Sequence, residues 1–120
     1  MVDKTDNSNQ LVVNEEFVDA PVEDVWQAVA TEDGRERWLT EEDAERELVV
    51  ESEQAPGEQG FDSGRIVWWW WADGEEPRRV ELLVVAAPRG TRVIAIESAP
   101  GLPLTLLASM FVGAGVNVCA

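Results

Sequence analysis

Four tryptophans in a row, Trp68 to Trp71, constrain the fold of this chain more than any other feature. Successive side chains of a β-strand point to opposite faces, so Trp68 and Trp70 would share one face and Trp69 and Trp71 the other. A helix would spread the four indoles around most of its circumference and bury them poorly. We therefore predict a strand over 65–72, which the Asp-Gly pair that follows would close with a hairpin turn.

The chain is strongly acidic. It has 120 residues, with 24 acidic against 9 basic side chains and a net charge of −15. This length suits one domain with a single core. Because phosphates would be repelled by such a surface, we expect no nucleic acid partner, and an anionic membrane surface is disfavoured in the same way.

Several residue types that carry chemistry are absent. The sequence contains no histidine, no tyrosine and a single cysteine, Cys119. A serine or cysteine nucleophile activated by histidine is therefore excluded, and so is a zinc site built on imidazole or paired thiolates. We expect no metal, no cofactor and no catalytic nucleophile. A single thiol also allows no disulfide within the chain, which suits a cytoplasmic location.

The first ten residues are polar and contain no apolar run of the kind found in signal peptides. We predict a disordered tail over 1–10 and a single domain over 11–120.

A strand and a helix are expected next. Residues 11–18 have the alternation of a strand. Over 21–30, valine and tryptophan recur at i, i+3, i+4 and i+7, which is the spacing of one helix face. Trp26 belongs to this apolar stripe and is therefore expected in the core.

A second short helix is expected over 33–38. Asp33 and Glu36 have the spacing of a capping box, and Trp38 ends the segment. The acidic stretch 40–45 that follows is expected to be a loop.

The strand period then returns. Strands are predicted over 46–52, 65–72, 78–87 and 91–98. The short turns between most of them favour an antiparallel meander, and hence an α+β fold.

The end of the chain has a different composition, with no charged residue over 98–120. Three interpretations are open: a buried helix over 103–112, a membrane anchor, and a truncated or altered terminus. Proline and glycine interrupt the segment and no basic residue flanks it, which favours the buried helix.

Five segments together are similar to a known family. They are FVDAPVEDVWQAVATEDGRERWL (17–39), VVESEQAPGE (49–58), IVWWWWAD (66–73), RRVELLVV (78–85) and PRGTRVIAIES (88–98). They resemble the START-like, or SRPBCC, superfamily, and most closely its bacterial members related to the activator of the heat-shock-protein-90 ATPase. The resemblance implies a helix-grip fold, in which a curved antiparallel sheet follows two short helices after strand one and packs against a C-terminal helix.

The chain departs from that family in two places. The family usually has an additional hairpin before the meander, where this chain has only 40–45, so we expect a sheet one or two strands shorter. The last helix of the family normally has charges on its outer face, whereas 98–120 has none.

The resemblance also implies an apolar small-molecule cavity between the sheet and the last helix. We expect Trp68 and Trp70 to face inward beside Ile66, either lining that cavity or filling a small core. Trp38, at a helix end, would lie at the cavity mouth or in the core. The expected ligand-binding residues are Trp38, Ile66, Trp68, Trp70, Leu82, Val84, Leu107 and Phe111.

Trp69 and Trp71 would then form an exposed apolar patch, suited to a homodimer or a protein partner. The leading hypothesis for function is a binder of an apolar small molecule. The alternatives are a protein-interaction or co-chaperone-like module and a cyclase-type enzyme. An enzyme would depend on charged cavity residues such as Glu97, Arg65 or Arg92.

Overall fold

The computed structural model describes residues 11–57, 62–98 and 101–119, with side chains up to Phe111. The predicted tail over 1–10 and the side chain of Cys119 lie outside the described residues.

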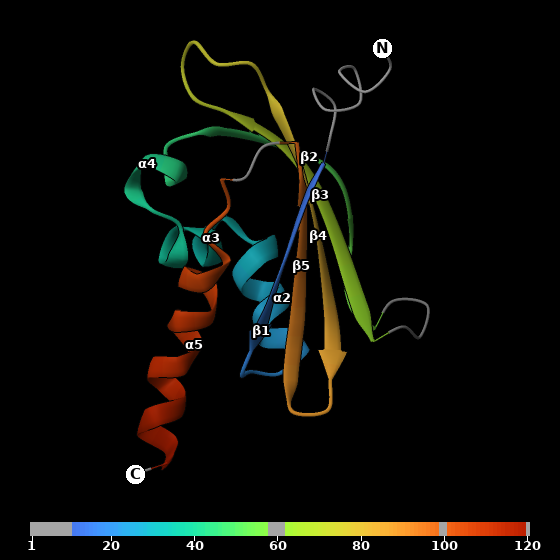
Figure 1. The fold of residues 1–120 in the computed structure, drawn as a ribbon, viewed down its shortest axis with the longest axis vertical. Helices are drawn as coiled ribbons and strands as arrows, with labels where there is room; N and C mark the ends of the chain where they lie inside the picture. The colour runs from blue at the N-terminus through green and yellow to red at the C-terminus, as the bar shows by residue number, and fades with distance from the viewer. Residues whose placement is uncertain (1–10, 58–61, 99–100, 120) are drawn as a thin grey trace.

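The strands form one antiparallel sheet. Its members are β1 (Val12–Val18), β2 (Glu47–Gln54), β3 (Ser63–Trp71), β4 (Arg78–Ala87) and β5 (Gly90–Glu97). The strand order is β1-β5-β4-β3-β2, so β2 to β5 form the predicted meander and β1 pairs with β5. The sheet is curved (Figure 1), and a bulge between Val50 and Ser52 interrupts the register of β2.

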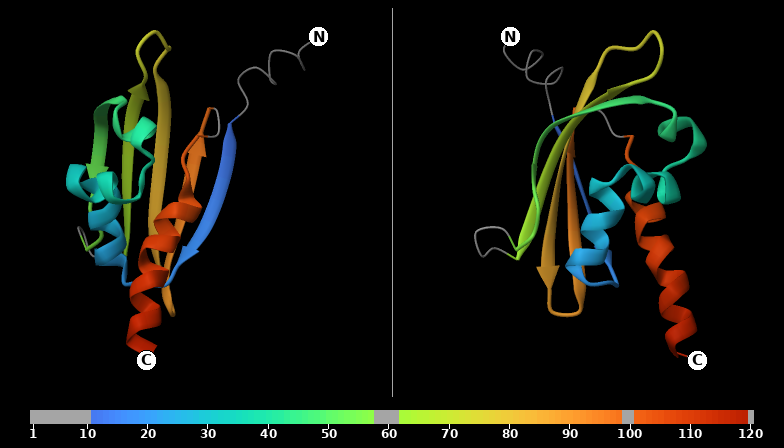
Figure 2. Two further views of the ribbon diagram at one scale, coloured as in Figure 1. Left: turned by 90° about the vertical axis from the view of Figure 1, so that its left-hand side faces the viewer. Right: turned by 180° about the vertical axis from the view of Figure 1, so that it is seen from behind.

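All the helices lie on one side of the sheet, as the two views of Figure 2 show. They are α2 (Val22–Ala30), α3 (Glu32–Trp38), α4 (Glu41–Ala44) and α5 (Leu104–Cys119). α2 packs on β3 to β5, and α5 packs on β1 and α3. The predicted α+β helix-grip arrangement is confirmed, with five strands in the sheet.

Two details of the helices differ from the sequence prediction. α3 begins at Glu32 because Thr31 is its N-cap: the Thr31 Oγ1 accepts a hydrogen bond from the Gly34 N–H at 2.9 Å. The proposed capping box of Asp33 and Glu36 is therefore wrong.

The stretch expected to be an acidic loop contains the short helix α4. The Thr40 side chain caps it, because Oγ1 accepts from the Asp43 N–H at 3.1 Å. Residues 41–44 therefore form one helical turn where a loop was expected. α5 also continues past the predicted end at residue 112, as far as Cys119.

The core lies between the inner face of the sheet and the helices. Its largest fully buried side chains include Trp68, Trp70, Ile66, Leu82 and Leu107. Leu104 and Ala108 of α5 are also buried, which agrees with the buried-helix interpretation. Within the described ranges, no helix is both long enough and apolar enough to span a bilayer.

Candidate functional site

The tryptophan strand presents two indoles to the core and two away from it. Trp68 and Trp70 are 0% and 1% exposed, whereas Trp69 is 38% exposed. Trp71 is half-buried. The prediction that Trp68 and Trp70 face inward is confirmed. Their ring centroids lie 5.8 Å apart at 67°, an edge-to-face arrangement that favours contact between indoles.

Two arginines cover these buried indoles. The guanidinium of Arg35, on α3, lies 5.5 Å from the ring centroid of Trp68. That of Arg46, just before β2, lies 5.3 Å from the ring of Trp70. Both distances are in the range of a cation–π contact. Charged guanidinium groups therefore cover the two inner indoles, whereas apolar side chains would cover them in an ordinary core.

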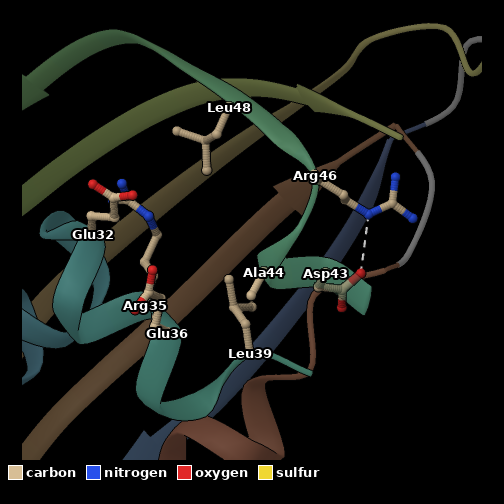
Figure 3. Close-up of a pocket in the computed structure, with 8 residues that line it drawn as sticks. All are labelled: Glu32, Arg35, Glu36, Leu39, Asp43, Ala44, Arg46 and Leu48. Atoms are coloured by element: carbon tan, nitrogen blue, oxygen red, sulfur yellow. Dashed lines mark hydrogen bonds and ion pairs between the residues drawn. The ribbon is translucent and has the colours of Figure 1, made fainter. Parts of the chain in front are cut away.

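A pocket opens beside these arginines (Figure 3). It has a volume of about 240 Å³ and is bounded by α3, α4 and the start of β2. Leu39, Ala44 and Leu48 supply its apolar lining. The other lining residues are charged: Glu32, Arg35, Glu36, Asp43 and Arg46.

Arg46 is held firmly in place. It forms ion pairs with Glu75 at 2.6 Å and with Asp43 at 3.1 Å. The hydrogen bond to Glu75, followed by that to Asp43, raises the pKa of Arg46 despite partial desolvation. The same bond lowers the pKa of Glu75. This network joins α4, the start of β2 and the turn after β3.

Arg35 is held differently. Its Nη1 donates to the backbone carbonyl oxygen of Val29 at 3.0 Å. Desolvation by burial lowers the pKa of Arg35, and the charges of Glu32 and Glu53 offset this only in part. Removal from water therefore destabilises the charged form of Arg35 where it lies.

The structure places most of the expected ligand-binding residues in the core. Six of them are at most 1% exposed: Ile66, Trp68, Trp70, Leu82, Val84 and Leu107. Trp38 is buried too, and its Nε1 donates to the Ala28 carbonyl oxygen at 2.8 Å. Phe111 is half-buried and lines a shallow groove between α2, α3 and α5.

Sequence reasoning missed the residues that line the pocket of Figure 3. They come from α3, α4 and the start of β2, and their types and spacing match no known motif. Only the T-x-x-D spacing of Thr40 and Asp43, which is a helix-start signal, could have indicated α4. It would thereby have indicated one side of the pocket.

Two residues named for possible cavity chemistry lie elsewhere. Arg65 pairs with Glu81 at 2.6 Å and Arg92 with Glu15 at 2.7 Å, both on the sheet face that the helices leave uncovered. Placing them in the cavity was wrong, because their strand parity is that of Trp69. Glu97 does face the interior and is 2% exposed.

Comparison with known proteins gives the fold. No family model and no curated protein match the chain. The crystal structure of protein CV1439 from Chromobacterium violaceum matches with a TM-score of 0.53 and 16% identity, over 85% of this chain and 97% of that one. DynU16, from the dynemicin biosynthetic locus, matches with a TM-score of 0.51 and 19% identity, over 87% of this chain but only 42% of that one. The solution structure of the Aha1 dimer from Colwellia psychrerythraea has a TM-score of 0.47 and 13% identity, over 91% of this chain and 90% of that one.

Proposed function

We propose that this chain is a START-like binding module whose ligand is a neutral, apolar molecule with one or two rings. The ligand docks over Trp68 and Trp70, in the pocket between α3, α4 and β2. The observation that supports this most is the pair of buried indoles covered by two guanidinium groups beside an open pocket.

The size of the pocket limits the ligand. A cavity of about 150 Å³ accommodates benzene, and the pockets that bind drug-sized ligands measure about 300 Å³ or more. The pocket here has about 240 Å³. A molecule of one or two rings fits this volume, whereas a sterol or a long acyl chain would require the helices to move apart.

The charges of the lining favour a neutral ligand. Three carboxylates, those of Glu32, Glu36 and Asp43, oppose the two arginines. Arg46 already has two carboxylate partners, and the whole chain carries a charge of −15. Of the two lining arginines, only Arg35 has no carboxylate partner in an ion pair among the described residues, and desolvation already disfavours its charge. An anionic ligand would therefore meet three carboxylates and an unfavourable overall field.

Arg35 is the group that a ligand would displace. Arg46 is fixed by Asp43 and Glu75, whereas Arg35 is desolvated over Trp68. If Arg35 swings into solvent, its guanidinium regains hydration and exposes the indole face. A ligand ring then stacks on that face in its place.

Indole N–H signals in a 1H–15N NMR spectrum test this binding directly, because each tryptophan gives one signal. Saturating additions of 2-methylnaphthalene should shift the signals of Trp68 and Trp70. The signals of Trp38 and Trp69 serve as internal controls, since their Nε1 atoms are bonded to the Ala28 carbonyl and to Glu51. Absence of a saturable shift, or equal shifts of all six signals, would contradict the proposal.

Two arginine variants sharpen the test. In Arg35→Leu an apolar side chain replaces the guanidinium over Trp68. Leucine gains no hydration when it moves into solvent, so a ligand should displace it less easily. Ligand binding should therefore weaken at least about tenfold. Arg37→Ala removes an equal charge from the same helix at an exposed position that does not line this pocket. Its affinity should match that of the wild type.

The uncovered face of the sheet supports a second candidate function, a homodimer interface. Large apolar side chains are exposed there on β1, β2 and β3 and on the residue before β1: Leu11, Val13, Phe17, Val49 and Trp69. The arginines of this face have glutamate partners, Arg65 with Glu81, Arg79 with Glu51 and Arg92 with Glu15. A second copy would therefore meet paired charges and exposed apolar side chains.

Sedimentation velocity over a range of protein concentrations tests the dimer. The wild type should associate as the concentration rises, and Trp69→Glu should shift it to the monomer. A wild type that stays monomeric at high concentration would exclude this second function without affecting the first.

A further inference from the structure

Two buried polar atoms have no hydrogen-bond partner among the described residues: the Nε1 of Trp68 and the Oε2 of Glu97. One is a donor and the other an acceptor. A buried polar group without a partner costs free energy, so such atoms are uncommon in folded proteins.

The sheet register places these two residues on one row. Val80 of β4 pairs with Trp68 of β3 on one side and with Glu97 of β5 on the other. All three side chains are buried on the inner face of the sheet. At the usual strand spacing, the Cα atoms of Trp68 and Glu97 lie roughly 9–10 Å apart, with only Val80 between them in the sheet.

Each of the two residues lies near a side chain that lines the pocket. Arg35, which lines the pocket, covers the ring of Trp68. Asp43, another lining residue, is close enough to influence the charge of Glu97. Neither Trp68 nor Glu97 lines the pocket itself, because the indole N–H and the carboxylate oxygen are buried in the core. A ligand in the pocket would reach them only after Arg35 has moved away from Trp68.

We propose that Trp68 Nε1 and Glu97 Oε2 together bind a hydroxyl group of the ligand, which identifies the ligand class as ring-bearing alcohols or phenols. This inference rests on the proposed function, because it assigns the polar end of the same site. The hydroxyl oxygen accepts a hydrogen bond from the indole N–H, and the hydroxyl hydrogen donates to the carboxylate. One group therefore satisfies both atoms, since a hydroxyl is both a donor and an acceptor.

The surroundings of Glu97 fit this role. Burial raises its pKa, while the backbone N–H groups of Leu102 and Gly101 and the charge of Arg78 act in the opposite direction. A hydroxyl can donate to the ionised carboxylate or accept from the protonated one. It therefore suits Glu97 in either state, whereas a carbonyl oxygen would leave an ionised Oε2 without a donor.

The experiment compares two ligands of similar size, 2-naphthol and 2-methylnaphthalene, by 1H–15N NMR titration of the wild-type protein. We expect 2-naphthol to bind about tenfold more tightly, because only it satisfies both buried atoms. The Trp68 indole N–H signal should also move downfield with 2-naphthol and not with 2-methylnaphthalene, which offers no acceptor.

Variants then identify the two partners. Trp68→Phe removes the N–H and Glu97→Met removes the carboxylate, and each should reduce the ratio of the two dissociation constants to about one. The ratio is taken within each variant, so a general loss of affinity cancels. Trp38→Phe removes a buried indole N–H at another place in the core and should keep the wild-type ratio.

The outcomes separate this inference from the proposed function. If both ligands bind equally well and the Trp68 signal does not distinguish them, the hydroxyl site is wrong and the ring-binding module stands. If neither ligand binds, both are wrong. The wild-type signal of Trp68 decides the question even where a core variant does not fold.

Discussion

At the residue scale, Glu97 is the most unusual side chain of this protein. It is a carboxylate 2% exposed at the end of β5, facing an apolar core. Its pKa is raised chiefly by desolvation. The folded state therefore holds the proton of Glu97 at pH values where the unfolded chain has released it. The contribution of Glu97 to stability is therefore largest below the ordinary pKa of glutamate, and it is lost as the pH rises through the raised, folded-state pKa.

Glu97→Gln should remove this pH dependence. The variant should gain free energy of unfolding relative to the wild type as the pH rises above about 4.5. The charges nearest Glu97, those of Arg78 and Asp43, remain in both proteins. Urea unfolding at several pH values measures the difference, and Glu76→Gln, at an exposed position, controls for the loss of one negative charge. A difference that stays constant with pH would contradict the effect of burial.

The tryptophan strand gives a second prediction at this scale. Trp70 is 1% exposed and packs on Trp68, so Trp70→Ala should cost about 3–5 kcal/mol of stability. Trp71 is half-buried on the uncovered face, and Trp71→Ala should cost less than half as much in a monomer. Denaturant unfolding of both variants at two protein concentrations measures these costs. Equal losses that do not depend on concentration would mean that both indoles are equally buried within one chain.

At the element scale, the pocket depends on how α3 is positioned. Thr31 lies between α2 and α3: its hydroxyl donates to the Gln27 carbonyl oxygen at 2.7 Å and accepts from the Gly34 N–H at 2.9 Å. One side chain thus closes the end of the first helix and starts the second, and so places Arg35 over Trp68.

Thr31→Ala should therefore affect both stability and the site. The loss of an N-cap costs about 1 kcal/mol. Because α3 would be less firmly placed, the cover over Trp68 should loosen and the Trp68 indole signal should broaden. Thr31→Ser keeps the hydroxyl and should restore both properties. A variant with alanine that leaves stability and the signal unchanged would show that the cap is not needed.

Sequence patterns predicted the strands better than the helix ends. Alternation located all five strands. The physical cause is clearest in β4 and β5, where buried side chains recur at every second residue. α4 was missed because four polar residues give no apolar period, and the end of α5 was placed too early because glycines were read as interruptions. Helix ends depend on caps such as Thr31, for which the sequence offers several candidates.

At the scale of the whole molecule, the order of the elements along the sequence predicted the fold but did not predict the site. The inward direction of Trp68 and Trp70 agrees with the sequence prediction. Their cover by Arg35 and Arg46 could not be predicted, because those arginines lie far from the tryptophans in sequence and only the tertiary structure brings them together. None of the eight residues expected to bind a ligand lines the pocket: seven lie in the core and Phe111 lines another groove. Their role as a binding surface stays a prediction.

The central claim is that a small ring-bearing molecule binds between α3, α4 and β2 over the inner indoles. Intermolecular nuclear Overhauser effects between 2-methylnaphthalene and protein labelled with 13C on leucine and valine methyl groups test it most directly. We expect cross-peaks to Leu39 and Leu48, which line the pocket. Cross-peaks to Val13 and Val49 on the uncovered face, or none to Leu39 and Leu48, would contradict the claim.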